Sequence, residues 1–311
     1  MNDRSRGGTA RNIQAKPETA AGAGDTERLF ELFKARAPAE DMAAYDPAAL
    51  RHAARLAAAA LKRHRRGENV IAIDNDPALQ HQGRAITAIT VINDNMPFLF
   101  DSISGEVNET AGEPSLVLHP VLYVKHGRGG VAAIVGDAGG GKADPGADRV
   151  SLIHVHVPRL PARDCEALRE RLEHILRQVR LAVRDWKPML ARLDQAITDL
   201  RYLPTPLERA AVDEAVAFLE WLRDNNFTFL GMREYRYRGT EKEGELQRTG
   251  GEGLGILTDP NVLVLRRGTE AVTTTPEIRA FLHGPEPMIV TKANAKSVVH
   301  RRIYLDYVGV K

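Results

Sequence analysis

Along the chain, hydrophobic residues first recur with the period of a helix. Between residues 25 and 66, apolar side chains return every three or four positions, which is typical of helices that bury one face. Asp46, directly followed by proline, predicts the start of the second of these helices, and a run of cations before Gly67 predicts its end. Residues 1–24 are mostly small and polar, so we expect a disordered tail there.

From residue 70 onward, short β-branched runs alternate with amphipathic segments. Strands are predicted at 70–73, 85–92, 116–124, 131–135 and 150–157, and helices at 97–111 and from 161 onward. Residues 86–181 therefore follow the order β-α-β-(β)-β-α, which is close to a ferredoxin-like sandwich. No fourth strand is recognisable after the second helix. We hypothesise that the strand at 70–73 takes the position of this fourth strand in the sheet. Pro120 predicts a bend or an edge in its strand, and Pro188 predicts a break in the long helix.

A second α+β module is predicted after residue 203. Thr205 and Glu208 form a capping-box pattern that predicts the start of a helix. Strand-like segments follow at 227–237, 262–265, 287–291 and 298–307. Because Lys311 comes directly after an apolar strand, we expect this module to be truncated. The predicted parts are a tail (1–24), N-terminal helices and a short strand (25–84), a domain with the long kinked helix (85–203) and the incomplete second module (204–311).

Composition and charge exclude several classes of protein. The 311 residues are 43% hydrophobic, which is enough to build real cores, and the formal net charge is +2. That small charge and an aromatic content of 5% argue against a nucleic-acid partner. The single cysteine, Cys165, excludes an internal disulfide, and no apolar run is long enough to span a membrane. We therefore expect a cytoplasmic protein with no membrane and no nucleic-acid partner.

Two glycine-rich stretches and one histidine pair are candidate chemical sites. Residues 136–143 resemble a phosphate-binding loop, but Ala143 stands where a hydroxyl residue is needed, so a flexible hairpin loop is predicted. Residues 250–255 lack the dinucleotide fingerprint and are predicted to form a tight turn. His154 and His156 share one face of a strand. A titrating surface or interface pair is favoured over a metal site with Cys165 as third ligand. Core packing is predicted for four aromatic residues: Trp186, Trp221, Phe227 and Phe229.

The segment that joins the first strand to the first helix of the sandwich is the most informative. It reads Asn95, Met96, Pro97, Phe98, Leu99, Phe100, Asp101, Ser102. Free amides at such a helix start can receive an anionic group such as an amino-acid carboxylate. The segment resembles the acid-x-Pro-Gly-Leu turn of ACT domains, which are small amino-acid-sensing modules.

In this resemblance, Asn95 takes the acidic position and Phe98 stands where the glycine is expected. A phenylalanine is expected to fill the space that an effector would need, so a structural or interface role is favoured over ligand binding. Its replacement by glycine is expected to cost roughly 3 kcal/mol of stability or more. The candidate effector or interface residues are Asn95, Met96, Pro97, Phe98 and Asp101.

Six segments in order carry a wider family resemblance. They are residues 95–102, 118–122, 185–190, 227–235, 253–257 and 304–311. Together they resemble the N-terminal region of the large bacterial NAD-dependent glutamate dehydrogenases, over roughly residues 26–311. The resemblance implies that the complete protein oxidises L-glutamate to 2-oxoglutarate and ammonium with NAD. It also implies that this ACT-like region serves regulation and assembly in a homo-oligomer, next to the remaining domains of the same polypeptide.

No catalytic residue carries over from this resemblance. In that family the substrate and dinucleotide domains lie far toward the C-terminus, and nothing in this chain matches their catalytic lysines or glycines. We therefore expect no catalytic, cofactor-binding or metal-binding residue here, with NAD bound only by the full-length enzyme. Two alternatives remain. One is a free-standing ACT-like amino-acid-sensing protein, which a stop codon after Lys311 would favour. The other is a small enzyme that uses the 136–142 loop, which nucleotide binding would favour.

Overall fold

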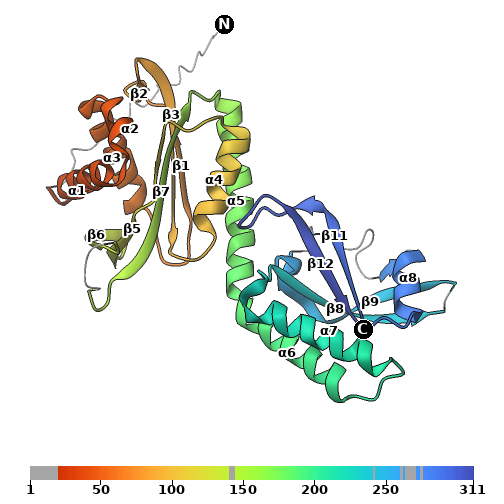
Figure 1. Ribbon diagram of the computed structural model, residues 1–311. Helices are drawn as coiled ribbons and strands as arrows, with labels where there is room; N and C mark the ends of the chain where they lie inside the picture. The colour runs from red at the N-terminus through yellow and green to blue at the C-terminus, as the bar shows by residue number, and fades with distance from the viewer. Residues whose placement is uncertain (1–19, 140–143, 241, 260–261, 263–270, 274–275) are drawn as a thin grey trace, which may run out of the picture.

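The chain folds into two α+β parts that a long helix connects (Figure 1). This computed structural model describes residues 20–139, 144–240, 242–259, 262, 271–273 and 276–311. The connecting helix, α5 (Ala162–Arg184), covers the sheet of the first part with its N-terminal half and reaches the second part with its C-terminal end. Among the described residues, no helix is long and apolar enough to cross a bilayer.

The first part is built on an antiparallel sheet. Its main strands are β1 (Val70–Asp74), β3 (Arg84–Asp94), β7 (Asp148–Pro158), β5 (Val121–Gly127) and β6 (Gly130–Asp137), in that spatial order. The short strands β2 (Gln80–His81) and β4 (Leu116–Leu118) pair with β3 and β7. Since β1 pairs with the free side of β3, it takes the place that the sequence pattern left open after the second helix.

Pro120 bends a strand in the interior of this sheet. Both β4 and β5 pair with β7, and the strand is interrupted between them at His119 and Pro120. The carbonyl of Pro120 still accepts a hydrogen bond from the Leu152 amide at 3.0 Å. The predicted bend is therefore confirmed, and the strand is not at an edge because β6 lies beyond β5.

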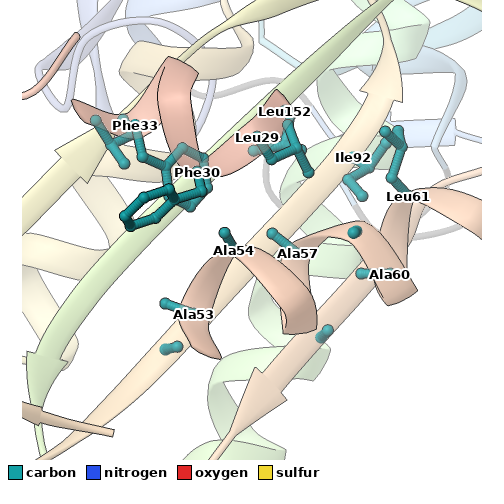
Figure 2. Packing of buried hydrophobic residues seen from close by; sticks show 14 of the residues in the cluster. Leu29, Phe30, Phe33, Ala53, Ala54, Ala57, Ala60, Leu61, Ile92 and Leu152 are labelled. Carbon is teal, nitrogen blue, oxygen red and sulfur yellow. The ribbon is translucent and has the colours of Figure 1, made fainter. Parts of the chain in front are cut away.

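Helices cover both faces of the sheet (Figure 1). On one face lie α1 (Ala20–Arg36), α2 (Ala39–Ala43) and α3 (Pro47–Lys62), and on the other lie α4 (Leu99–Thr110) and α5. Figure 2 shows how large residues of α1 pack against an alanine-rich face of α3 and against the sheet. The labelled residues are Leu29, Phe30, Phe33, Ala53, Ala54, Ala57, Ala60, Leu61, Ile92 and Leu152. Both faces of the central strands are therefore buried.

Local signals set most of the helix ends. The Asp46 carboxylate accepts a hydrogen bond from the Ala48 amide at 2.9 Å, so the predicted start of α3 is confirmed. The helix ends at Lys62, where the run of cations begins, and Arg63 is its C-cap. Gly67 is therefore not the residue that stops the helix, and its left-handed φ of 78° belongs to a later turn. The break at Pro188 is also confirmed, because α5 ends at Arg184 and α6 (Trp186–Tyr202) begins two residues later. Helix α1 begins at Ala20, inside the predicted tail, and residues 1–19 lie outside the described residues.

The predicted start of the next helix is wrong. Helix α7 (Arg209–Trp221) begins after Glu208, whose side chain makes no capping hydrogen bond. The Thr205 hydroxyl instead accepts a hydrogen bond from the Leu207 amide at 3.3 Å. Thr205 thus stabilises a turn before the helix, which is the common alternative use of this side chain.

The second part contains a helical hairpin and two small sheets. Helices α6 and α7 are followed by a short helical turn (Leu222–Asn226), β8 (Gly231–Gly239), β9 (Gly244–Gly255), another turn (Ile256–Thr258), β10 (Ala271–Thr273), α8 (Pro276–His283), β11 (Met288–Lys296) and β12 (Tyr304–Val310). Strands β8, β9 and β10 form one sheet, and β11 and β12 form another. The predicted strand at 298–307 is partly wrong, because residues 298–303 form the loop between β11 and β12.

Two other predictions for this part also need correction. Residues 250–255 belong to β9 and not to a tight turn, although the pairing shifts between Leu254 and Thr249, so the glycines form a bulge. Trp186 and Trp221 are 48% and 52% exposed, whereas Phe227 and Phe229 pack on the α6–α7 core as predicted. Trp221 lies two residues after the buried Leu219, which places it on the opposite side of the helix.

Candidate effector or interface turn

The turn singled out in the sequence lies at the end of β3 and at the start of α4. We refer to residues 95–101 as the 95–101 turn. The Asn95 amide donates to the Arg149 carbonyl at 2.9 Å, which ties the end of β3 to β7. Pro97 is exposed, and Met96 and Phe98 are half-buried against the core on this side of the sheet. Asn95, Met96, Pro97, Phe98 and Asp101 therefore lie in one short surface segment, as its sequence implies.

Phe98 has the backbone conformation of a glycine. Its φ is 69° in the left-handed region, directly before the first residue of α4. This region costs a non-glycine residue about 1–2 kcal/mol. The Phe98 carbonyl accepts hydrogen bonds from the Ser102 amide at 3.1 Å and from the Ser102 hydroxyl at 2.6 Å. The backbone of the turn thus has the conformation that favours glycine. The two hydrogen bonds from Ser102 stabilise Phe98 in this conformation.

A loop from the far end of the chain covers this turn. We refer to residues 297–302, which lie between β11 and β12, as the 297–302 loop. The His300 amide donates to the Ser102 hydroxyl at 2.9 Å, and His300 Nδ1 lies 2.9 Å from Asp101 Oδ2. The rings of Phe98 and His300 are 5.1 Å apart. Val299 is 1% exposed and packs into the same core as Leu99 of α4.

A buried carboxylate joins the same loop to two helices. Glu106 of α4 is 4% exposed. One of its oxygens accepts a hydrogen bond from Arg171 of α5 at 2.6 Å, and the other accepts one from Arg302. Arg302 also lies over Gly105, where an added Cβ would come within 3.1 Å of its side chain. Two guanidinium groups therefore compensate the burial of this charge, and one of them belongs to the loop.

The turn also contacts a second segment of the family resemblance. The Phe100 and His119 rings stack at 5.0 Å with an angle of 5°. His119 Nε2 lies 2.8 Å from the Ser151 hydroxyl. Burial, followed by the charge of Arg36, lowers the pKa of His119 below its ordinary value. A neutral imidazole is the form that stacks on an apolar ring at the lowest desolvation cost.

His154 and His156 are not a surface pair, and this correction follows from the helices that cover their face. Both are almost fully buried, at 0% and 1% exposed. They belong to one chain of hydrogen bonds, each 2.9 Å long, that runs from Thr90 to His154, His156, Tyr45 and Ser115. Burial lowers the pKa of His154 to about 3 and holds that of His156 well below its ordinary value. Burial also raises the pKa of Tyr45 to about 12.

The metal alternative for this pair has no geometric support among the described residues. The Nε2 atoms of His154 and His156 are hydrogen-bonded to each other, and Cys165 lies on α5, on the opposite face of the sheet. Its sulfur accepts a hydrogen bond from Asn75 at 3.4 Å. In the part of the chain that the structure describes, no three potential metal ligands come together. Of the 136–143 loop, residues 140–143 lie outside the described residues.

A second pair of histidines, at the end of the same sheet, was not predicted from the sequence. His64 Nδ1 lies 3.2 Å from His126 Nε2, and His126 Nδ1 lies 2.7 Å from Asp148. Asp94, next to the 95–101 turn, lies 3.6 Å from His64 and accepts a hydrogen bond from the Gly67 amide. Burial lowers the pKa of His64. His300 and Arg302 were missed too, and no local sequence signal marks them, because their partners lie almost 200 positions away.

The sheet, the helices and the strand-turn-helix segment together define an ACT-type domain, and comparison with known proteins agrees. Residues 29–172 match the family described as glutamate dehydrogenase, ACT1 domain. The family resemblance of the sequence is thus confirmed for this region, which is similar to the ACT1 domain of glutamate dehydrogenases.

Two curated relatives extend the similarity beyond this domain. Over 229 residues, the chain is 32% identical to an NAD-specific glutamate dehydrogenase of Halomonas elongata and 29% identical to one of Pseudomonas aeruginosa. Each alignment covers 72% of this chain but only 14% of the relative. The similarity therefore concerns a small part of much longer proteins.

Proposed function

We propose that this chain is the N-terminal regulatory and assembly region of a large NAD-dependent glutamate dehydrogenase. The observation that carries the proposal is the match of residues 29–172 to the ACT1 domain of that enzyme, continued in a 229-residue alignment with NAD-specific relatives. On this proposal the complete polypeptide converts L-glutamate and NAD to 2-oxoglutarate, ammonium and NADH in the cytoplasm. Domains outside this chain bind NAD and glutamate.

The geometry supports a domain that makes contacts and does no chemistry of its own. The first part is a ferredoxin-like sandwich with an added helical layer, and its candidate turn is engaged by the second part of the chain. Exposed aromatic and apolar residues on α6, α7 and the residue after α6 suit an assembly surface: Trp186, Tyr202, Leu203 and Trp221. We therefore expect a homo-oligomer in which this region contacts other domains or other subunits.

An exchange of segments tests the proposal. The matching segment of the Halomonas elongata enzyme is replaced by residues of this chain, and a second variant lacks the segment altogether. We expect the exchanged enzyme to remain an active oligomer that produces NADH from glutamate. We expect the deleted enzyme to lose its oligomeric state or its kinetic response to amino acids. The purified chain alone should produce no NADH.

Two results would contradict the proposal. One is enzyme-dependent NADH production by the isolated chain, which would require a dinucleotide site in it. The other is a deleted enzyme with the same oligomeric state, the same glutamate saturation and the same response to added amino acids as the parent. That result would show that the region serves neither regulation nor assembly.

A further inference from the structure

Strand β1 forms one end of the sheet in the first part of the chain, and its outer edge has no partner strand among the described residues. It pairs with β3 alone, in an unbroken register from Val70 to Asp74. It contains no proline, lysine or bulge, which are devices that commonly blunt an edge strand. In the described part of the chain, only Arg169 of α5 caps this edge, through a hydrogen bond from its Nη1 to the Ile71 carbonyl at 2.6 Å. An edge of this kind can accept a further strand.

The register of the sheet shows which backbone groups β1 turns outward. Backbone groups alternate in direction along a strand, and the Leu152 amide of β7 points to the β5 side, where it donates across the sheet at 3.0 Å. The groups of Ile153 therefore point to β3, and those of its partner Val91 point back to β7. The partner of Val91 in β1 is Ile71, whose amide and carbonyl thus point away from the sheet. The same alternation turns the amide and the carbonyl of Ile73 outward.

Beside this edge, the surface between β1, the end of α3 and α5 is hollowed. The hollow has a volume of about 580 Å³, and we refer to it as the β1 hollow. Its lining consists of Arg63, Glu68, Asn69, Val70, Ile71, Arg169, Glu173 and Arg177. Val70 packs on the core under α3, whereas Ile71 packs on the core under α5. The β1 hollow therefore offers room on both sides of the open edge.

The β1 hollow carries an excess of positive charge, because its lining has three arginines but two glutamates. The guanidinium groups of Arg63 and Arg177 form no hydrogen bond or ion pair with any described residue. Arg180 adds a further cation, which bonds Asn69 and other neutral oxygens at 2.7 and 3.0 Å. Asp74, at the far end of β1, is not part of the lining. This distribution of charge complements an acidic partner.

We propose that the outer edge of β1 binds an extended acidic segment of another polypeptide, which adds a strand to the sheet. The outward groups of Ile71 and Ile73 pair with the backbone of this segment. In the free chain, Arg169 occupies the Ile71 carbonyl. In the complex, an amide of the segment takes this carbonyl, and Arg169 and Arg177 bind carboxylates of the segment. The proposal goes beyond the proposed dehydrogenase function and does not rest on it.

An acidic strand uses both features of this edge, whereas other occupants use one. A free anion would pair with the arginines but would leave the outward amides of Ile71 and Ile73 without a partner. A basic strand would pair with these amides, but the arginines would repel it. A second copy of the chain, paired through β1 about a two-fold axis, would bring two positively charged hollows together.

The test uses the whole chain and a short peptide that alternates glutamate and valine. One control peptide has glutamine in place of glutamate. The other keeps glutamate but carries an N-methyl group on each glutamate amide. Directly opposite residues share one face of a sheet, so these are the amides that pair with Ile71 and Ile73 when the carboxylates face α5.

A variant of the chain tests the charges separately. It combines Arg63→Gln with Arg177→Gln and removes two cations that no described residue binds, so the fold should persist. Arg163→Gln is the matched control, because Arg163 is an exposed arginine of α5 outside the lining. Circular dichroism melts check that both variants remain folded.

Calorimetry measures binding, and hydrogen exchange measures strand pairing. We expect the glutamate peptide to bind the parent and the Arg163→Gln control at least tenfold more tightly than the double variant. We also expect the parent to bind it at least tenfold more tightly than either control peptide. The amides of Ile71 and Ile73 should exchange at least tenfold more slowly in the complex. The amide of Ala72 faces β3 and should be protected with and without peptide.

Each opposite result overturns the proposal. Equal binding of the N-methylated peptide would show that the arginines bind carboxylates without an added strand. Equal binding of the glutamine peptide, or equal binding by the double variant, would show that charge does not select the partner. A dimer of the chain in which the Ile71 and Ile73 amides are protected would assign this edge to a second copy. Because none of these measurements involves glutamate turnover, they can fail while the proposed dehydrogenase function stands.

Discussion

Replacement of Phe98 by glycine and by alanine separates backbone strain from packing at the 95–101 turn. The sequence alone suggests that Phe98→Gly costs roughly 3 kcal/mol or more, as for a buried ring. In the structure Phe98 is mostly but not fully buried, so the lost burial is about 1.5–2.5 kcal/mol, somewhat less than the 2–3 kcal/mol of a fully buried phenylalanine. Glycine also relieves the left-handed φ of 69°, which is worth about 1–2 kcal/mol.

These contributions nearly cancel for glycine but not for alanine. We expect Phe98→Gly to change the free energy of unfolding by no more than about 1 kcal/mol, because glycine also adds some entropy to the unfolded chain. Phe98→Ala loses the same packing and keeps most of the strain, so it should destabilise the protein by about 1.5–2.5 kcal/mol. The glycine variant should therefore be the more stable of the two.

Urea unfolding followed by circular dichroism gives this comparison. The matched control is Glu173, an exposed residue in the interior of α5, where Glu173→Ala should be more stable than Glu173→Gly by about 1 kcal/mol. The order of alanine and glycine is thus expected to invert between the two sites. A Phe98→Ala variant as stable as Phe98→Gly, or more so, would refute the reasoning from backbone strain.

The buried chain of hydrogen bonds gives two more predictions. Tyr45→Phe leaves Nδ1 of His156 without its partner and should lower the free energy of unfolding by about 1–3 kcal/mol in urea, and no loss would contradict the bond. Because burial lowers the pKa of His154 to about 3, only the unfolded chain binds this proton between about pH 6.5 and pH 3. Stability should therefore fall with decreasing pH in that window, by up to about 1.4 kcal/mol per pH unit for each such histidine. His154→Leu combined with His156→Leu should flatten this slope, and an unchanged slope would contradict the assignment.

The sequence pattern predicted most strands and helices of the first part because its helices bury one continuous face and its central strands are continuous apolar runs buried on both faces. The order from β1 to α5 follows directly from runs of β-branched residues and from apolar residues at helical spacing. Asp46 marks the start of α3 through its own side chain, which bonds an amide two residues on, so this signal is local. The residues next to one another in the sequence are therefore enough to predict these helices and strands.

Where the prediction failed, the deciding interaction was not local. Thr205 has the side chain of a helix cap but stabilises a turn before α7. The glycine-rich residues 250–255 show no hydrophobic period, so a bulged strand and a turn look alike in the sequence. His154 and His156 were placed at a surface because alternation shows which residues share a face of a strand but not what covers that face. The second helical layer, α1 to α3, decides their burial.

The same argument explains why the sequence revealed the 95–101 turn but not the 297–302 loop that covers it. The 95–101 turn is visible in the sequence because a strand, a proline and a helix start follow one another within a few residues. The 297–302 loop contains no regular element, and its partners Asp101, Ser102 and Glu106 lie almost 200 positions earlier. Only the folded chain brings the two together.

Three of the six segments that carry the family resemblance also meet in space. The carboxylate of Asp185, between α5 and α6, accepts a hydrogen bond from the Gly255 amide at 2.8 Å. The carbonyl of Leu230, just before β8, accepts one from the Ile256 amide at the same distance. These bonds join residues 185–190, 227–235 and 253–257 at the end of α5. Three of the six segments therefore lie together where the two parts of the chain are connected, which explains why they follow one another at fixed spacing in the sequence.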